Sequence, residues 1–171
     1  MEPSGVLIVN KSEGMTSHDV VNKVRRLYNT KRVGHAGTLD PLATGVLVVL
    51  VGRAAKACEY ISSDRKTYRA TLRLGLTTDT EDITGEALTK SENIPDCETV
   101  KAICREFVGE IKQIPPMYSA LKVNGQKLYD LARKGKEVER QPRTITIHAL
   151  ELLDFTGETA TLRVACSKGT Y

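Results

Sequence analysis

The chain has 171 residues, a net charge of +4, 40% apolar residues and 27% charged residues. These proportions are typical of a folded globular protein and exclude wholesale disorder or a collagen-like fibre. A chain of this length buries about two thirds of its unfolded surface, so it needs no metal or disulfide to fold. The longest apolar run, residues 46–51, is too short to span a bilayer, and no signal peptide is recognisable at the N-terminus, so we expect a cytoplasmic protein.

Charge is unevenly distributed along the chain. Residues 20–39 contain five basic residues and no acidic one, and residues 53–73 and 122–143 each have a net charge of +4. Residues 79–98, in contrast, have a net charge of −6. Such segregation could present a positive face to a polyanion such as a nucleic acid. The solvated surface of an ordinary enzyme accounts for the same charges equally well, so charge alone leaves both interpretations open.

Local patterns predict a strand, a helix, a glycine-rich loop, a strand, a helix and a strand in the first half of the chain. Their ranges are residues 6–9, about 17–28, 33–44, 45–51, 54–61 and 67–74. Thr16 or Ser17 is the expected N-cap of the first helix. The apolar stripe of this helix follows the helical period and consists of Val20, Val21, Val24 and Leu27.

The second half continues with a polar, acidic loop, a helix that Asp96 can cap, a chain break, a short helix and two successive strands. Their ranges are residues 79–85, 96–107, 114–116, 126–133, 143–155 and 159–167. Because strands and helices are interspersed and two successive strands close the chain, we expect an α+β fold. Its sheet is mixed or largely antiparallel with flanking helices, within one domain over residues 1–171.

The four cysteines do not have the spacing of a metal site. None of Cys58, Cys97, Cys104 and Cys166 belongs to a C-x-x-C pair, and no histidine lies at zinc-finger spacing. Cys97 and Cys104 are seven residues apart in a predicted helix and could share a face. We interpret all four as reduced packing residues and expect no metal.

The most unusual stretch is residues 34–45, G-H-A-G-T-L-D-P-L-A-T-G, in the loop before the apolar strand. It lacks the Gly-Lys-Ser/Thr of a phosphate-binding loop and the glycine spacing of a dinucleotide fingerprint. Its one carboxylate is Asp40, next to Pro41. A carboxylate on a loop held by a rigid scaffold is a candidate catalytic group, although an Asx-turn before the proline is an equally physical role.

The segment G-H-A-G-T-L-D-P-L-A-T-G-V-L (34–47) resembles the nucleophile loop of the TruB family of tRNA pseudouridine-55 synthases. Four other segments resemble the family in the same order along the chain. They are G-V-L-I-V-N-K-S-E-G-M-T-S (5–17), K-T-Y (66–68) with L-G-L-T-T-D-T-E-D-I-T-G (74–85), I-P-P-M-Y-S-A-L-K-V-N-G-Q-K-L-Y (114–129) and S-K-G-T-Y (167–171). The resemblance therefore covers essentially the whole chain.

The resemblance implies isomerisation of one uridine in the tRNA T loop to pseudouridine, without cofactor or metal. Asp40 matches the catalytic aspartate, which either attacks C6 of the base or assists through a glycal at the sugar. Tyr68 matches the tyrosine whose ring stacks on the flipped uracil. His35 matches the histidine that fills the space left by the flipped base. Lys56 matches a lysine near the RNA, and Asp82 an acid that pairs with a catalytic arginine. The alternative for Tyr68 is a tyrosine packed in the core, and the alternative for Asp82 is a solvated acid. His35 and Lys56 could equally be ordinary surface residues.

Residues 114–143 match the family's RNA-clamping insertion. Their candidate RNA contacts are Tyr118, Lys122, Lys127, Arg133 and Arg143, and Tyr171 of the closing motif is a further candidate. Basic residues interleaved with aromatic rings suit a folded single-stranded loop, whereas a merely basic hairpin is the alternative. The Pro-Pro break and the length of the segment favour a mobile element.

One departure from the family concerns the end of the chain. The family's last motif continues into an Ile-Arg pair, and its arginine binds the catalytic aspartate, whereas this chain stops at Tyr171. The family's later helices and PUA-like domain are also absent, so we expect a truncated, weakly active catalytic domain. A non-catalytic RNA-binding fragment is the alternative, and a small-molecule nucleotide enzyme is disfavoured because no phosphate loop is present. The expected partner is tRNA, with no membrane and no obligatory protein partner.

Overall fold

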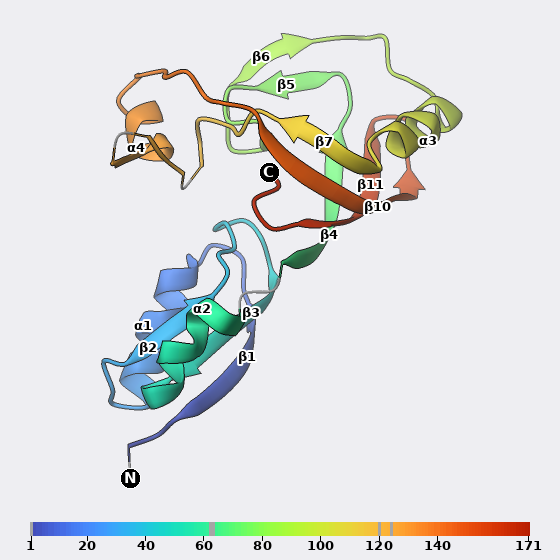
Figure 1. Ribbon diagram of the computed structural model, residues 1–171. Helices are drawn as coiled ribbons and strands as arrows, with labels where there is room; N and C mark the ends of the chain where they lie inside the picture. The colour runs from blue at the N-terminus through green and yellow to red at the C-terminus, as the bar shows by residue number, and fades with distance from the viewer. Residues whose placement is uncertain (1, 62–63, 120, 124) are drawn as a thin grey trace. The chain divides into compact units, whose positions relative to one another are not determined.

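The computed structural model describes residues 2–61, 64–119, 121–123 and 125–171. The chain divides into two units, Met1–Ser63 and Asp64–Tyr171, and each unit has its own sheet (Figure 1). The two units are described separately below. Among the described residues, the helices are all too short or too polar to cross a membrane.

The first unit is a three-stranded antiparallel sheet with the order β1-β3-β2. β1 (Gly5–Lys11) pairs along its whole length with β3 (Gly45–Val51), and β2 (Val33–Ala36) pairs with the other edge of β3. β2 corrects the sequence prediction, which placed a loop over residues 33–44. Val33 and Ala36 are buried, so tertiary pairing with β3 outweighs the loop-forming tendency of the glycine between them.

α1 (Ser17–Leu27) covers this sheet through Val20, Val21 and Val24, which form one core cluster with Val33 and the inward side chains of β3. Thr16 caps the helix reciprocally with Asp19, as a capping box. Leu27 was expected in the same apolar stripe but is 81% exposed. Leu27 lies on the same face of α1 as the valines, but it belongs to the last turn, where no described residue covers it.

Two short helices complete the first unit. The sequence predicted one helix over residues 54–61, whereas the structure has a 3-10 helix, η1 (Gly52–Ala57), followed by α2 (Cys58–Ile61). A Cβ at Gly34 of β2 would lie 2.9 Å from Cys58 Sγ. The glycine therefore allows α2 to pack closely on β2.

The second unit is a four-stranded antiparallel sheet with the order β4-β11-β10-β7. Its strands are β4 (Arg65–Arg73), β7 (Gly109–Gln113), β10 (Arg143–Phe155) and β11 (Thr159–Ser167). α3 (Cys97–Glu106) packs Val100 and Cys104 against Ala160 and Leu162 of β11, and Asp96 caps it as predicted. The predicted strands 143–155 and 159–167 are confirmed, and so is the largely antiparallel α+β class.

β4 forms close to the predicted position, but its side chains are more exposed than the sequence pattern predicts. The alternation over residues 67–74 predicts one buried face, yet both Tyr68 and Leu72 are at least 40% exposed. β4 is an edge strand of the four-stranded sheet, and its contact to the sheet is mainly the ladder with β11. Two further hairpins, β5 (Leu76–Thr78) with β6 (Ala87–Lys90) and β8 (Lys122–Val123) with β9 (Gln126–Lys127), were not predicted.

Candidate active site and nucleic-acid interface

Asp40 lies in the loop between β2 and β3, and its side chain is exposed. The Asp40 carbonyl oxygen accepts a hydrogen bond from Ala43 N at 3.0 Å, which closes a turn. The carboxylate is therefore carried at the rim of the first unit by a short, hydrogen-bonded loop. A loop of this kind, supported by paired strands on both sides, is a suitable carrier for a reacting group.

The backbone before Asp40 is anchored by Ser17, whose side chain is buried at the start of α1. Ser17 Oγ accepts a hydrogen bond from Leu39 N at 2.9 Å and lies 3.2 Å from Leu39 O, to which it donates. One hydroxyl thus satisfies both main-chain groups of the residue next to Asp40. The sequence pattern suggests only a helix cap at Ser17, because its partner Leu39 lies 22 residues away.

The backbone after Asp40 is anchored by Lys11, which is only 1% exposed. Lys11 Nζ donates to the carbonyl oxygens of Ser12, Met15 and Pro41, at 3.0, 2.7 and 3.2 Å. Three acceptors match the three N–H groups of an ammonium, which is how a buried lysine avoids an unmet charge. Gly14 N also donates to Pro41 O, at 2.8 Å.

Lys11 was not singled out as a site residue, although one signal in the sequence could have found it. In β1 the side chains alternate, and Lys11 has the same parity as Leu7 and Val9, which pack against the core. The period of the strand therefore turns this lysine inward, at the end of the strand where polar carbonyls are available.

His35 and Lys56, the other candidates of the first unit, have different environments. His35 lies on β2, half-buried, and its Nδ1 is 2.6 Å from Gly37 O. Because a carbonyl oxygen only accepts, Nδ1 carries the proton in this contact. Lys56 is exposed on η1. The structure thus places His35 at the start of the Asp40 loop, whereas it records no contact between Lys56 and that loop.

Tyr68 and Asp82 belong to the second unit. Tyr68 lies on β4 opposite Val164 of β11 and is 40% exposed, so it is not the core tyrosine of the alternative interpretation. Asp82 lies in the turn-rich loop between β5 and β6. Its Oδ1 accepts hydrogen bonds from Thr80 Oγ1, Thr84 N and Thr84 Oγ1, at 2.8, 2.8 and 2.5 Å. Burial acts to raise the pKa of Asp82, but these bonds outweigh it and lower the pKa.

The insertion at residues 114–143 contains the β8–β9 hairpin followed by α4 (Leu128–Ala132). The helix is shorter than the predicted 126–133, because residues 126–127 pair in the hairpin instead. Leu128 and Leu131 of this helix are buried. Tyr129 N and Leu128 N donate to the carbonyl oxygens of Ser119 and Leu121 and so close the module.

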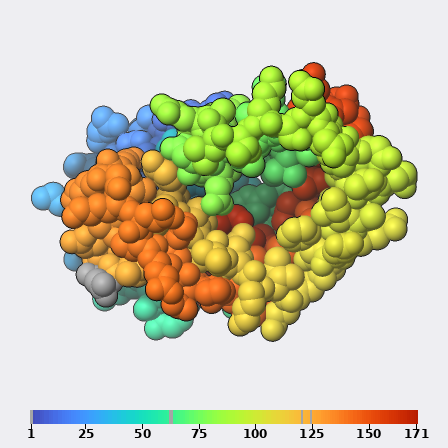
Figure 2. Space-filling view, turned by 90° about the horizontal axis from the view of Figure 1, so that it is seen from above, coloured from blue at the N-terminus to red at the C-terminus, as the bar shows by residue number. Residues whose placement is uncertain are grey.

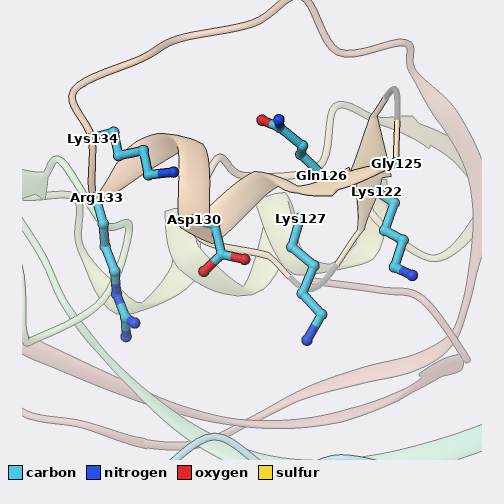
Figure 3. Close-up of a pocket in the computed structure, with 7 residues that line it drawn as sticks. All are labelled: Lys122, Gly125, Gln126, Lys127, Asp130, Arg133 and Lys134. Carbon is cyan, nitrogen blue, oxygen red and sulfur yellow. The ribbon is translucent and has the colours of Figure 1, made fainter.

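A cavity of about 530 Å³ in this module is lined mainly by cations. Lys122, Lys127 and Arg133 project to the same side, with Asp130 between the last two (Figure 3). Lys127 Nζ is 2.9 Å from Tyr129 Oη, and this contact raises the pKa of Lys127. Lys127 and Arg133 lie 5.1 and 5.4 Å from the centre of the Tyr129 ring, as cation–π pairs. Tyr129 was not among the RNA contacts predicted from the sequence, although its ring contacts both of these cations.

The remaining candidates lie on either side of the insertion. Arg143 opens β10 and pairs with Gln113, the last residue of β7. Gln113 also binds the backbone of Tyr171 through both its amide atoms, at 2.6 and 3.0 Å. The structure therefore brings Arg143 and Tyr171 to one strand end, whereas Tyr118, 40% exposed, follows β7 in the connecting segment.

The second unit is hollowed on the side seen in Figure 2. The segment around α4, in orange, and the segment that follows α3, in yellow, border this hollow, and red C-terminal residues are visible at its bottom. Within the described part of the chain, no group of three or more His, Cys, Asp or Glu side chains is placed to hold a metal ion.

Comparisons with known proteins point to one family. A family model described as "TruB family pseudouridylate synthase (N terminal domain)" matches residues 25–171. The chain is 53% identical over 175 residues to tRNA pseudouridine synthase B of Bacillus licheniformis and 49% identical over 170 residues to that of Francisella philomiragia. These alignments cover 98% of this chain but only 57% and 56% of the relatives, so the chain spans a little over half their length.

Two solved structures are similar over 98% of the chain. The first is a Cbf5-Nop10-Gar1 complex, with a TM-score of 0.73, 29% identity and 40% of that chain covered. The second is an H/ACA RNP bound to a substrate RNA containing 2'-deoxyuridine, with a TM-score of 0.69, 25% identity and 39% of that chain covered. In both, the similarity extends over both units of this chain.

Proposed function

Because this chain belongs to the TruB family of pseudouridylate synthases, we propose that it converts the uridine at position 55 of the tRNA T loop to pseudouridine, with Asp40 as the catalytic carboxylate. The family match confirms the resemblance inferred from the motifs. The observation that supports the role of Asp40 is its exposed carboxylate on a loop that Ser17 and Lys11 anchor on both sides. A cytoplasmic location, where tRNA is processed, is part of the proposal.

The reaction is an isomerisation and needs no external oxidant or group donor. The N1–C1′ bond breaks, the uracil turns, C5 bonds to C1′, and the proton at C5 is lost while N1 gains one. Asp40 acts either at C6 of the base or at the sugar, and in both routes its carboxylate must meet the substrate in a fixed geometry. The hydrogen bonds at Leu39 and Pro41 restrict the backbone that carries it.

The target base lies in a folded loop and must be flipped out to reach the carboxylate. We assign stacking on the flipped uracil to Tyr68, since its ring is partly exposed on an edge strand. His35 fills the space that the base leaves. Asp82 is proposed to pair with a catalytic arginine, and its two threonine partners hold its carboxylate in place for such a contact.

We assign RNA binding in the second unit to the cationic module at residues 114–143. Its charges surround an aromatic ring, which offers phosphate contacts and a stacking face together. Arg143, Tyr118 and Tyr171 are proposed to extend this surface, and Lys56 to contribute from the first unit.

The test is pseudouridine formation in an unmodified tRNA transcript. The chain is assayed alone and joined to the remaining C-terminal part of the Bacillus licheniformis relative, under single-turnover conditions. We expect Asp40→Asn to abolish product formation and leave tRNA affinity nearly unchanged, because the amide has the same shape but is not a nucleophile. Asp154→Asn, an exposed aspartate of β10, is the matched control.

A rate for Asp40→Asn within about tenfold of the unsubstituted protein, a barrier change of only ~1.4 kcal/mol, would contradict the catalytic role. Tight tRNA binding with no product in either form of the protein would favour the second candidate, an RNA-binding module without activity. The cation-lined cavity at α4 is the observation that supports this second candidate.

A further inference from the structure

The outward face of α1 contains a groove that the proposed function does not use. Its volume is about 650 Å³, and we call it the α1 groove. It is lined by Met15, Asp19, Asn22, Lys23, Arg25 and Arg26. The inward face of the same helix is occupied by valines of the core, so the groove lies on the more polar side of the helix.

The α1 groove has a net positive charge, because three cations line it and Asp19 offsets one of them through its interaction with Lys23. Lys23 and Arg26 are exposed, and neither forms an ion pair with any residue that the structure describes. Asp19 is the one carboxylate of the groove, and its Oδ2 accepts hydrogen bonds from Thr16 N and Thr16 Oγ1, at 2.9 and 2.6 Å, so it is held at the start of α1. The recorded partner of Lys23 Nζ is Met15 Sδ at 3.6 Å, which carries no charge.

Arg25 adds a pre-oriented guanidinium to the groove wall. Its Nη1 donates to Asn22 Oδ1 at 3.1 Å, and its Nη2 donates to Val33 O at 3.4 Å. Its Nε is buried without a hydrogen-bond partner among the described residues. A guanidinium held in one orientation loses little entropy when it binds an anion, and its planar fork suits phosphate oxygens.

The α1 groove lies beside the Asp40 loop in the same unit. Met15 lines the groove, and its carbonyl oxygen shares the Lys11 ammonium with Pro41 O, the carbonyl just after Asp40. A nucleotide whose base reaches Asp40 remains joined on both sides to phosphodiester groups. Those phosphates must therefore pass close to the Asp40 loop, and Met15 connects this loop to the groove that contains the cations.

We propose that the α1 groove binds the phosphodiester backbone of the RNA whose uridine reaches Asp40, through Lys23, Arg26 and Arg25. The nature of the ligand rests on the proposed function, because the RNA is the substrate proposed above. The contact goes beyond that function, since it adds a binding surface on the first unit to the cationic module of the second. Phosphate contacts of this kind position a nucleic acid without reading its sequence.

The test compares the salt dependence of tRNA binding for matched charge variants. Lys23→Gln with Arg26→Gln removes two charges from the groove, and Lys90→Gln with Arg105→Gln removes two exposed charges from the second unit. Each phosphate contact contributes about 0.7–0.9 to the slope of log affinity against log salt. We expect the groove variant to bind more weakly and to lose about 1.4–1.8 of slope, whereas the control keeps its slope.

Charge-retaining Lys23→Arg with Arg26→Lys should restore the original slope, which a merely structural effect on α1 would not do. Thermal unfolding shows whether each variant is folded. If the double variant is unstable, the two single Gln substitutions are measured in its place. A groove variant with the slope of the control refutes the proposal, whether or not pseudouridine forms. A reduced slope with no pseudouridine from either form of the protein supports the groove and refutes the proposed function, so the two failures are distinguishable.

Discussion

Replacing Ser17 by alanine tests whether the anchoring of the Asp40 loop serves catalysis. The hydroxyl accepts from Leu39 N at 2.9 Å and donates to Leu39 O at 3.2 Å, and alanine removes both contacts at a buried position. Each lost hydrogen bond contributes about 0.5–1.5 kcal/mol to stability. We therefore expect the free energy of unfolding of the first unit to fall by about 1–3 kcal/mol.

The effect on the reaction follows from the position of the contact. Without it, the peptide group that precedes Asp40 gains freedom, and the carboxylate meets its substrate less often in the reactive geometry. We expect the single-turnover rate at saturating protein to fall about tenfold, a barrier change of ~1.4 kcal/mol, with little change in tRNA affinity. Ser12→Ala, an exposed serine on the neighbouring turn, is the control for the loss of a hydroxyl.

Two measurements decide the outcome. Urea denaturation gives the change in stability, and single-turnover pseudouridine formation at a temperature where every variant is folded gives the change in rate. A loss of stability with an unchanged rate per folded molecule would show that Ser17 supports the fold alone. The reasoning about Asp40 would then be wrong, and other contacts would have to position the carboxylate.

Three further predictions address other parts of the structure. Lys11→Met should lower the free energy of unfolding by about 2–4 kcal/mol in urea denaturation, because three carbonyl oxygens lose a charged donor. Lys31→Met, at an exposed lysine, is the control, and a larger loss of stability in this control than in Lys11→Met would contradict the prediction. Residues 114–143 should exchange amide hydrogens rapidly in the free protein and slowly with tRNA bound; equal, strong protection in both states would reject a mobile clamp. The lowered pKa of Asp82 should stabilise the folded state above the ordinary value of 3.8, and this contribution should vanish as pH falls through the lower native value. Asp82→Asn should therefore reduce stability at neutral pH but not in strong acid, and a constant difference at all pH values would disprove the assignment.

Local sequence patterns correctly predicted the helices and strands whose formation depends mainly on their own residues. The valine stripe and the Thr16 cap predicted α1, Asp96 predicted the start of α3, and the runs at 143–155 and 159–167 predicted β10 and β11. Caps and side-chain periodicity act within a few residues, so they are visible before the chain folds. The loop carrying Asp40 was recognisable for the same reason, because its residues are contiguous.

The features that join distant segments depend on tertiary contacts. β2 forms in a glycine-containing stretch because β3 supplies its hydrogen-bond partners, and the exposure of Leu27 and Tyr68 depends on what lies beside them. The anchors of Asp40 bridge 22 residues at Ser17 and 30 at Lys11. No local pattern encodes these two long-range contacts, because they form only when β1, α1 and the loop before β3 come together in the folded first unit.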